Sequence, residues 1–394
     1  MTPFLWLCLM GGLAIFSSTM SKNPALPLFA QHLGATEADI GFIAAASTVV
    51  GIATSVPAGV LSDLYGRKRA ILASTFVFAS APFLYLLVRS AWQLALVRVY
   101  HGLATAILGP VALAAVADAF QARRGESMAW YSSATLIGRL LAPTVGGFLI
   151  LSPNNFNFVY LACGMAGLTA LAIAARTPLA SGGTSHRTGR RGLGAAGRQL
   201  ARGLGQVVVS RDILITGLME AVQYLAYGCV EVYLPLYALQ IGLAPWQIGP
   251  LLTTQVAITA LAKPLMGRLS DRWGRRLPIA GGLVLGALAL AAMPQARIYL
   301  LLMALAALFG LGVAMVTSST SPLASELCQT RAYGSAMGVL SSIKDVGHAS
   351  GPVVAGLLAT AFGYPFAFAA VAAALVSAAI VFLLSVAEPR RARP

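Results

Sequence analysis

Charged residues are scarce in this sequence. Asp, Glu, Lys and Arg make up 10% of the 394 residues, whereas soluble domains carry about 25%. Hydrophobic residues make up 58%, and the mean hydropathy is +0.79. Apolar runs of about 20 residues recur along the chain, each long enough to cross a hydrocarbon core of ~30 Å as a helix. These features exclude a water-soluble fold and predict an all-α polytopic membrane protein.

Several motifs of soluble enzymes are also missing. The sequence has no HExxH, no GxSxG, no metal-spaced Cys/His cluster and no GxxxxGK[ST] phosphate loop. We therefore predict no enzyme activity, no bound metal and no cofactor. The four cysteines form no CxxC pair and are predicted to pack as small hydrophobes; they are Cys8, Cys163, Cys229 and Cys328.

Twelve membrane spans are predicted from the apolar runs. The first six cover residues 5–31, 38–62, 70–88, 92–118, 126–151 and 156–175. The second six cover residues 212–240, 246–268, 276–294, 298–325, 334–362 and 364–386. The predicted domains are a six-helix bundle at 1–175, a basic cytoplasmic linker rich in Gly, Arg and Ser at 176–211, and a second six-helix bundle at 212–394.

The distribution of Lys and Arg predicts the orientation in the membrane. Loops after even-numbered spans and the C-terminal tail hold 20 of the 27, whereas only Arg89 and Arg297 lie in loops after odd-numbered spans. The positive-inside rule then places both termini and the linker in the cytoplasm. The net charge of +15 is scattered over short loops, so we expect contact with anionic lipid at the cytoplasmic face and no nucleic acid.

The two halves share an internal repeat. GVLSDLYGRKR at 59–69 returns as GRLSDRWGRR at 267–276, and GRLLAPTVGG at 138–147 returns as GHASGPVVAG at 347–356. Six-helix units that repeat in the same orientation are a known way to build a transporter whose site lies at the midplane between them.

These motifs, together with RVYHG at 98–102, resemble those of the major facilitator superfamily. The resemblance covers essentially the whole chain and is closest to twelve-span drug and metabolite proton antiporters, although Ala142 stands where these antiporters have Gly. It implies two pseudo-symmetric bundles of six helices. It also implies a helix-packing signature at Gly138, Pro143, Gly147, Gly351 and Pro352.

The doubled loop motif predicts a gate at the cytoplasmic end of each bundle. Its glycines allow close helix packing and a tight turn, and an acid four residues before an arginine suits a charge-assisted hydrogen bond. The resemblance implies a further acid at the end of span 4. The alternative to a gate is that the basic loops only set the orientation of the protein in the membrane. The predicted gate residues are Gly59, Asp63, Gly66, Arg67 and Asp118, with Gly267, Asp271, Gly274, Arg275 and Glu326 in the second half.

Charged residues inside spans are functional candidates, because each costs ~2.5 to 3.5 kcal/mol on insertion. Arg98 and Lys22 have no charged counterpart at the repeat offset, so we expect them to serve the substrate or ion instead of the shared scaffold. Lys263 is expected to extend its ammonium to the interface. The predicted substrate and proton cavity comprises Lys22, Arg98, Arg139, Glu220, Tyr224, Tyr227, Glu231, Lys344 and Asp345.

Span 7 carries a polar stripe. Glu220, Tyr224, Tyr227 and Glu231 step by four, three and four residues, which places them on one helix face. A carboxyl partly removed from water is suited to taking up and releasing a proton near neutral pH. The alternative for either Glu is a structural salt bridge to a cation of the other half, such as Lys22.

Three further expectations concern spans 1, 10 and 4. Pro24 weakens the helix beside Lys22, and the run TSSTSP at 317–322 predicts a break in span 10. On span 4, Arg98 shares a face with His101, and the resemblance implies that Arg98 takes part in proton coupling. His101 is expected to be a packing residue.

On span 11, Lys344 and Asp345 point about 100° apart on an ideal helix, so we expect them not to pair with each other. The spans together contain five cations and three acids, Glu220, Glu231 and Asp345. This excess of positive charge favours an anionic or zwitterionic substrate.

We interpret the chain as a proton-coupled secondary transporter of the prokaryotic cytoplasmic membrane. It is expected to act as a monomer and to export a small amphiphilic or anionic metabolite or drug by alternating access. One alternative is an importer of an organic anion such as a siderophore or carboxylate, working as a symporter or uniporter. Another is a receptor on the same scaffold.

Overall fold

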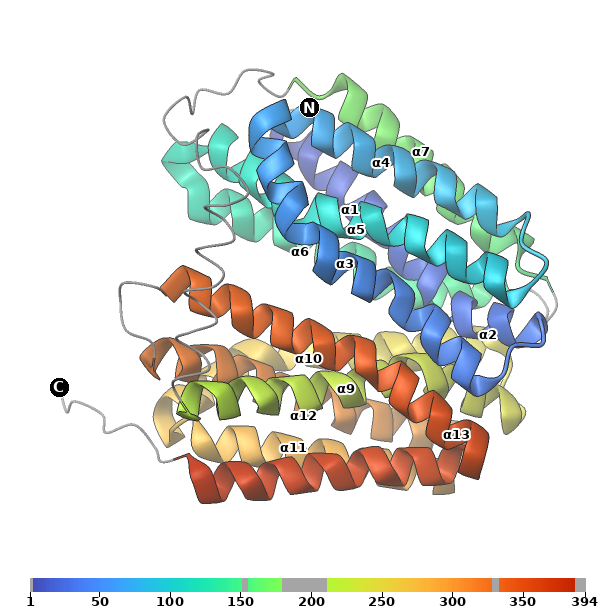
Figure 1. Ribbon diagram of the computed structural model, residues 1–394, viewed down its shortest axis with the longest axis vertical. Coiled ribbons are helices and arrows are strands. Elements are labelled where there is room, and N and C mark those ends of the chain that lie inside the picture. The colour runs from blue at the N-terminus through green and yellow to red at the C-terminus, as the bar shows by residue number, and fades with distance from the viewer. Residues whose placement is uncertain (1–2, 151–154, 179–210, 328–332, 387–394) are drawn as a thin grey trace. The chain divides into compact units, whose positions relative to one another are not determined.

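The computed structural model describes residues 3–150, 155–178, 211–327 and 333–386 (Figure 1). These residues form helices joined by short connections. In the first half the helices are α1 (Pro3–Lys22), α2 (Ala25–His32), α3 (Glu37–Tyr65), α4 (Arg67–Tyr85), α5 (Ala91–Ala119), η1 (Gln121–Arg123), α6 (Arg124–Leu149) and α7 (Asn157–Arg176). In the second half they are α9 (Arg211–Gln240), α10 (Pro245–Trp273), α11 (Arg276–Ala292), η2 (Met293–Gln295), α12 (Tyr299–Leu327) and α13 (Tyr333–Ser385).

The predicted fold of twelve membrane helices in two bundles is confirmed. Within the described residues, 8 helical stretches are long and apolar enough to span a membrane, and one of them, Met337–Ser385, contains two predicted spans. Gly363, with a φ of 81°, separates these two spans, and the chain reverses direction between them in Figure 1. The remaining spans are α4, α6 and α10, whose charged and small residues lower their hydropathy.

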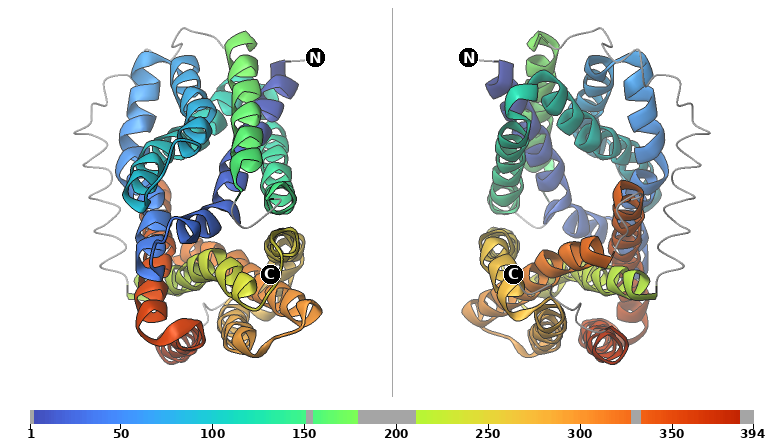
Figure 2. Two further views of the ribbon diagram at one scale, coloured as in Figure 1. Left: turned by 90° about the vertical axis from the view of Figure 1, so that its right-hand side faces the viewer. Right: turned by 90° about the vertical axis from the view of Figure 1, so that its left-hand side faces the viewer.

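Contacts divide the chain into two units, residues 1–196 with 242–253 and residues 197–241 with 254–394. In the first unit α1 packs on α6 and α7, and α4 packs on α5 and α7. In the second unit α9 packs on α13, and α11 packs on α12 and α13, as the two views of Figure 2 show within each unit. The two bundles are built alike, because the helices of the second follow those of the first by one repeat. In this correspondence α9 matches α1, α11 matches α4, α12 matches α5, and α13 matches the α6–α7 pair.

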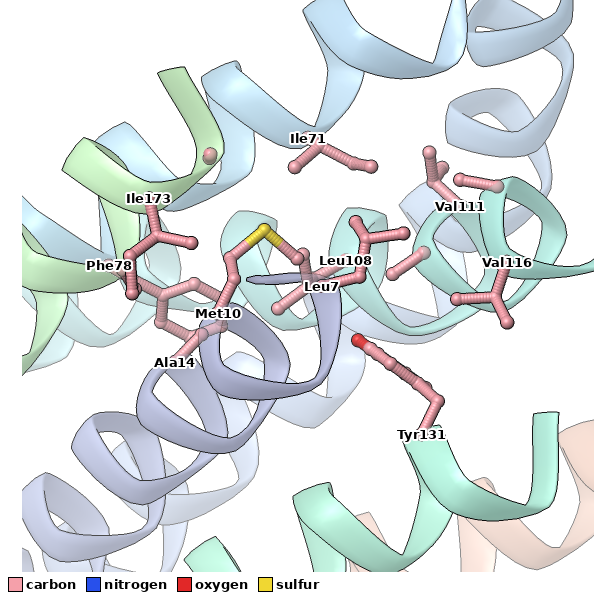
Figure 3. Packing of buried hydrophobic residues seen from close by; sticks show 14 of the residues in the cluster. Leu7, Met10, Ala14, Ile71, Phe78, Leu108, Val111, Val116, Tyr131 and Ile173 are labelled. Carbon is pink, nitrogen blue, oxygen red and sulfur yellow. The ribbon is translucent and has the colours of Figure 1, made fainter. Parts of the chain in front are cut away.

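The core of the first bundle is formed by apolar side chains from five helices. Leu7 and Met10 of α1, Phe78 of α4 and Leu108 of α5 are almost completely buried against one another (Figure 3). Tyr131 of α6 completes this cluster. These contacts fix the helices that carry the polar residues described below.

Glycines bring matching helices together in the two bundles. A Cβ on Gly138 would overlap the carbonyl oxygen of Gly12 in α1, and a Cβ on Gly347 would overlap that of Ala221 in α9. Both pairs are related by the same repeat offset. A Cβ on Gly351 would likewise overlap the carbonyl oxygen of Leu225. This close backbone approach explains why small residues recur in span 5 and span 11.

Proline acts differently in two spans. The first span breaks at the predicted place, because α1 ends at Lys22 and α2 begins after Pro24. The predicted break in span 10 is wrong, because α12 continues through Pro322 to Leu327. Hydroxyl side chains in the preceding turn bond to the helix's own carbonyls, as Thr317 does to Val313 at 2.8 Å, and such local bonds let membrane helices tolerate proline.

Candidate functional site

A tight turn joins two helices at each copy of the doubled motif. Gly66 follows α3 and Gly274 follows α10, and each has a φ of 96°, a region that residues with a side chain rarely adopt. Their amides donate to the carbonyl oxygens of Ser62 and Ser270, both at 3.1 Å. A Cβ on Gly267 would meet no atom within 4 Å, so close packing within its own bundle does not require glycine there.

In the first unit this turn is followed by Arg67. Its Nη1 donates to Ser62 Oγ at 2.6 Å, and its Nε donates to Asp118 Oδ2, near the end of α5, at 3.4 Å. We call this set the Arg67 clasp. Gly59 and the side chain of Asp63 lie outside the part of the chain whose packing the structure describes.

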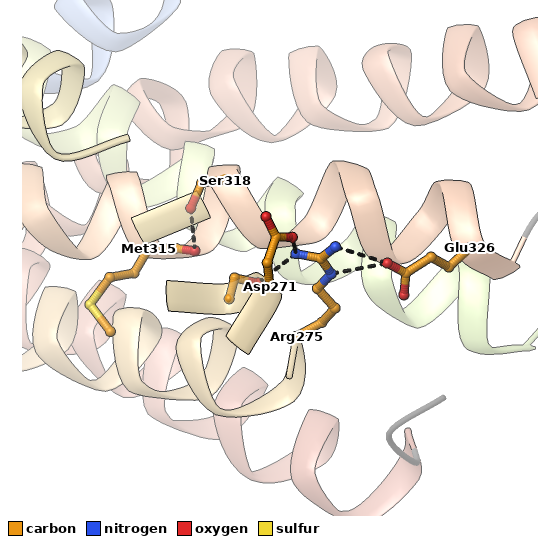
Figure 4. A network of polar contacts seen from close by, with 6 residues as sticks. Asp271, Arg275, Met315, Ser318 and Glu326 are labelled. Atoms are coloured by element: carbon orange, nitrogen blue, oxygen red, sulfur yellow. Dashed lines mark hydrogen bonds and ion pairs between the residues drawn. The ribbon is translucent and has the colours of Figure 1, made fainter. Parts of the chain in front are cut away.

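In the second unit the corresponding arginine is Arg275 (Figure 4). Arg275 Nη1 donates to Asp271 Oδ1 at 2.5 Å and to Ser270 Oγ at 3.2 Å. Its Nε and Nη2 both donate to Glu326 Oε1 of α12, at 3.1 and 2.9 Å. We call this set the Arg275 clasp. The Arg275 side chain is 14% exposed, whereas that of Arg67 is 27% exposed.

The charge on Arg275 is stabilised by these acids. Burial disfavours the charged form, but the hydrogen bonds to Glu326 and Asp271 outweigh burial and raise the pKa of Arg275 above its ordinary value. The guanidinium therefore stays charged at every physiological pH. A change in the Arg275 clasp must come from helix movement or from its acids.

Arg98 lies inside the first bundle. It is 3% exposed, and its Nη2 donates to Ser47 Oγ of α3. The Tyr85 hydroxyl at the end of α4 is a second polar neighbour. Among the described contacts Arg98 has no carboxylate partner, and its buried Nε makes no hydrogen bond. A buried cation with an unused donor is costly, which makes Arg98 a candidate for a functional role.

Aromatic residues surround Arg98. His101 Nδ1 lies 3.2 Å from Tyr85 Oη, and the Tyr85 and Tyr160 rings stack with centroids 4.7 Å apart. His101 Nε2 and the Tyr160 hydroxyl are buried and have no partner among the described residues. One of the two ring nitrogens of His101 therefore has a hydrogen-bond partner in the described set, and a packing role for this residue stays a prediction.

The membrane interior of the first bundle contains cations but no acids. Lys22 ends α1 and is half-buried, and Arg139 lies on an exposed face of α6. The acids of this half all stand near helix ends: Glu37, Asp39, Asp63, Asp118 and Glu126. All acids within membrane spans thus belong to the second bundle.

Glu231 is the most enclosed of these acids. It is 8% exposed, and its Oε2 lies 3.0 Å from Nε2 of His348 on α13. A Cβ on Gly228 would lie 2.6 Å from the carbonyl oxygen of His348, so glycine lets α9 approach α13 where the pair forms. A carboxylate and an imidazole at hydrogen-bond distance share one proton readily.

Two tyrosines of the predicted stripe surround the same histidine. The Tyr227 and Tyr224 rings lie 5.7 and 6.2 Å from the His348 ring, centroid to centroid. Lys344 Nζ lies 5.5 Å from the Tyr224 ring centroid, within cation–π range. The structure thus brings together Glu231, both tyrosines and Lys344 from the predicted set.

Glu220 lies about three turns from Glu231 along α9. Its Oε2 accepts a hydrogen bond from Thr320 Oγ1 of α12 at 3.0 Å. Lys344 and Asp345 are close enough to act on it electrostatically, as is Lys263 of α10. Lys344 Nζ and Asp345 Oδ1 are 3.8 Å apart, so the expectation that they do not pair is wrong, although the contact is long because adjacent residues diverge around the helix.

The model of the Major Facilitator Superfamily matches residues 7–252 and again residues 216–394. The chain belongs to this superfamily. It is 25% identical over 343 residues to an uncharacterized MFS-type transporter of Methanocaldococcus jannaschii, covering 86% of this chain and 87% of that protein. It is also 27% identical over 138 residues to the quinolone resistance protein NorA of Staphylococcus aureus, covering 35% of this chain and 36% of NorA.

Solved structures with the same fold include a bacterial homologue of the human lysosomal transporter Spinster. That structure aligns over 97% of this chain and 96% of its own with a TM-score of 0.81 and 16% identity. The nucleoside transporter NupG aligns over 98% of this chain and 99% of its own with a TM-score of 0.76 and 15% identity. The chain is thus a membrane transporter of the major facilitator type and an integral membrane protein.

Sequence patterns did not identify two sets of contacts in this transporter. Ser62 and Ser270 bind the clasp arginines, and their repetition in both LSD motifs was an available signal. The pairing of His348 with Glu231 joins residues 117 positions apart and has no signal in a single sequence. Within the described residues, no group of three or more His, Cys, Asp or Glu could hold a metal ion.

Proposed function

We propose that this transporter couples the export of a small amphiphilic or anionic metabolite or drug to proton entry by alternating access. The observation that carries the proposal is the Glu231–His348 pair, a carboxyl and an imidazole at 3.0 Å inside membrane-spanning helices. Glu231 and His348 hold the exchangeable proton. Protonation removes the negative charge of Glu231 and so weakens its attraction for nearby cations. This change shifts the equilibrium between different arrangements of α9 and α13, the helices that the pair joins.

The remaining predicted residues have assigned roles in this proposal. Arg98, Lys22 and Arg139 supply positive charge from the first bundle, where membrane-embedded acids are lacking in the sequence. The Arg67 and Arg275 clasps close the cytoplasmic end and open during the transport cycle. The positive-inside distribution supports cytoplasmic termini and the prokaryotic cytoplasmic membrane as the location, with a monomer as the working unit.

Everted membrane vesicles test both coupling and direction. Norfloxacin, benzoate and ethidium serve as zwitterionic, anionic and cationic probes, and an imposed pH gradient supplies the driving force. We expect gradient-driven accumulation of norfloxacin or benzoate, lost when the gradient is collapsed and lost in Glu231→Gln. Matched Glu220→Gln vesicles show whether the second carboxyl also carries protons.

The excess of membrane-embedded cations also fits an importer of an organic anion. Accumulation of benzoate in right-side-out vesicles, but not in everted ones, would replace export by import. If transport of every probe is independent of the pH gradient in both vesicle orientations, proton coupling is contradicted.

A further inference from the structure

We propose that the second bundle contains a binding site for a small zwitterion, whose ammonium is held by Glu220 and whose carboxylate is held by Lys344. This inference rests on the proposed transport function, because it names the substrate class. The site is a cavity of about 260 Å³ between the first turns of α9, the last turns of α12 and the first turns of α13. Its polar lining is Thr216, Glu220, Thr320, Ser321, Ser341 and Lys344.

The two charges in this cavity are not paired with each other. Within the described part of the chain, no ion pair joins Glu220 to Lys344, although both line the same space. Glu220 keeps one carboxylate oxygen beyond the one that accepts from Thr320. The Lys344 ammonium has a long contact with Asp345 at 3.8 Å and lies 5.5 Å from the Tyr224 ring centroid. Opposite charges left unpaired inside a membrane protein are costly unless a ligand binds them.

Hydroxyl groups in the lining are also available. Among the described contacts, neither the Ser321 nor the Ser341 side chain makes a hydrogen bond, and both line the cavity. A membrane-embedded wall with unused hydroxyl groups is suited to a ligand that carries donors and acceptors at both ends. A purely apolar occupant would leave them unsatisfied.

Charge and size select among the remaining ligand classes. A simple cation would meet Lys344, and a simple anion would meet Glu220, so either would face like charge at one end. A zwitterion satisfies both. The cavity is also smaller than pockets for drug-sized ligands, which span ~300 to 1,000 Å³. A larger groove of about 530 Å³ on α9 and α13 has no charged residue in its lining, so it offers no comparable site.

Binding to the purified full-length transporter tests this site without requiring transport. The probes are β-alanine, γ-aminobutyrate and ε-aminohexanoate, compared with butylammonium and butyrate, which carry only one of the two charges. We expect at least one of the zwitterions to raise the thermal unfolding temperature and to bind in calorimetry, and both single-charge probes to bind about ten-fold or more weakly, the factor for losing a charged hydrogen bond.

Variants separate this site from general effects on folding. Glu220→Gln and Lys344→Gln are each expected to weaken zwitterion binding by about ten-fold or more. The exchanged pair Glu220→Lys with Lys344→Glu keeps both charges in the cavity and is expected to restore binding. Ser341→Ala should weaken binding, whereas Ser342→Ala, the adjacent serine that lines the other groove, should leave it unchanged.

The outcomes distinguish the site from the transport function. Equal binding of zwitterions and single-charge probes, or no binding of any zwitterion, overturns the proposed site. Unchanged zwitterion binding in Glu220→Gln overturns it too. If the vesicle assay with norfloxacin or benzoate still shows proton-coupled transport in these cases, the transport function stands and only the zwitterion site is wrong.

Discussion

Arg98 is the residue whose chemistry its surroundings constrain most. The residue is 3% exposed, and its guanidinium donates to Ser47 and has no carboxylate partner among the described residues. The span prediction placed Arg98 in the membrane, but it did not indicate that the side chain lies inside the first bundle. That orientation depends on packing between α3, α4 and α5, which the sequence of α5 alone does not specify.

Replacing Arg98 by Lys should lower proton-driven transport by about ten-fold or more, because an ammonium cannot reproduce the forked donor set. The measurement is pH-gradient-driven norfloxacin or benzoate accumulation in everted vesicles. Arg89→Lys, in an exposed loop, is the matched control and should behave like the unmodified protein. Full coupled transport in a well-folded Arg98→Lys variant would remove Arg98 from the mechanism.

The two clasps should differ in strength. The Arg275 side chain is 14% exposed and donates twice to Glu326, at 3.1 and 2.9 Å, whereas the Arg67 side chain is 27% exposed and donates to Asp118 at the longer distance of 3.4 Å. We expect Arg275→Met to lower the unfolding temperature more than Arg67→Met, with each loss on the order of 1 kcal/mol because both clasps are partly exposed. Arg268→Met, on the exposed end of α10, is the control.

The pH dependence of the Arg275 clasp follows from its raised pKa. A group whose pKa is higher in the folded state stabilises that state fully below its unfolded pKa, and the contribution is lost as pH rises through the folded pKa. For an arginine this window is strongly alkaline. The difference in unfolding temperature between Arg275→Met and the unmodified protein should therefore stay constant from neutral to mildly alkaline pH. A difference that shrinks in this range would contradict the charged clasp.

At the scale of helices, α9 and α13 form the closest described contact of the second bundle. Gly228, Gly347 and Gly351 all lie where a Cβ would overlap the facing helix. This approach also brings Glu231 to His348. Packing and the proposed proton site therefore depend on the same glycines.

Substituting Gly347 by Val should destabilise the protein by about 1 to 3 kcal/mol, the usual cost of overpacking. It should also impair proton coupling, because α13 must move away from α9. Gly338→Val on the same helix is the control, since a Cβ there meets no atom within 4 Å. Unfolding temperature and vesicle transport are measured together, and equal behaviour of the two variants would contradict the close-packing account.

Helix positions were largely predictable because each span is a continuous apolar run. The α9 helix, Arg211–Gln240, begins one residue before the predicted span at 212–240. Local chemistry was less predictable. Pro24 ends a helix and Pro322 does not, since the outcome depends on whether nearby hydroxyls and neighbouring helices satisfy the backbone. The Glu231–His348 contact joins distant segments, so no local pattern contains it.

At the scale of the molecule, the repeat determines the scaffold, and we expect the residues that break the repeat to serve function. The turns at Gly66 and Gly274 share a φ of 96°, and their arginines bind matching serines. The membrane-embedded charges break this symmetry, because the first half has only cations whereas the second has all three acids together with Lys263 and Lys344. Proton chemistry is accordingly proposed for the second bundle.

Proton movement through purified protein tests this claim most directly. Proteoliposomes that contain the transporter and an internal pH-sensitive dye are given norfloxacin or benzoate, and proton flux and probe flux are recorded together. We predict that the unmodified protein moves protons with the probe. Glu231→Gln should move the probe down its own gradient without protons. Proton flux in Glu231→Gln equal to that of the unmodified protein would contradict the assignment of the coupling site to Glu231 and His348.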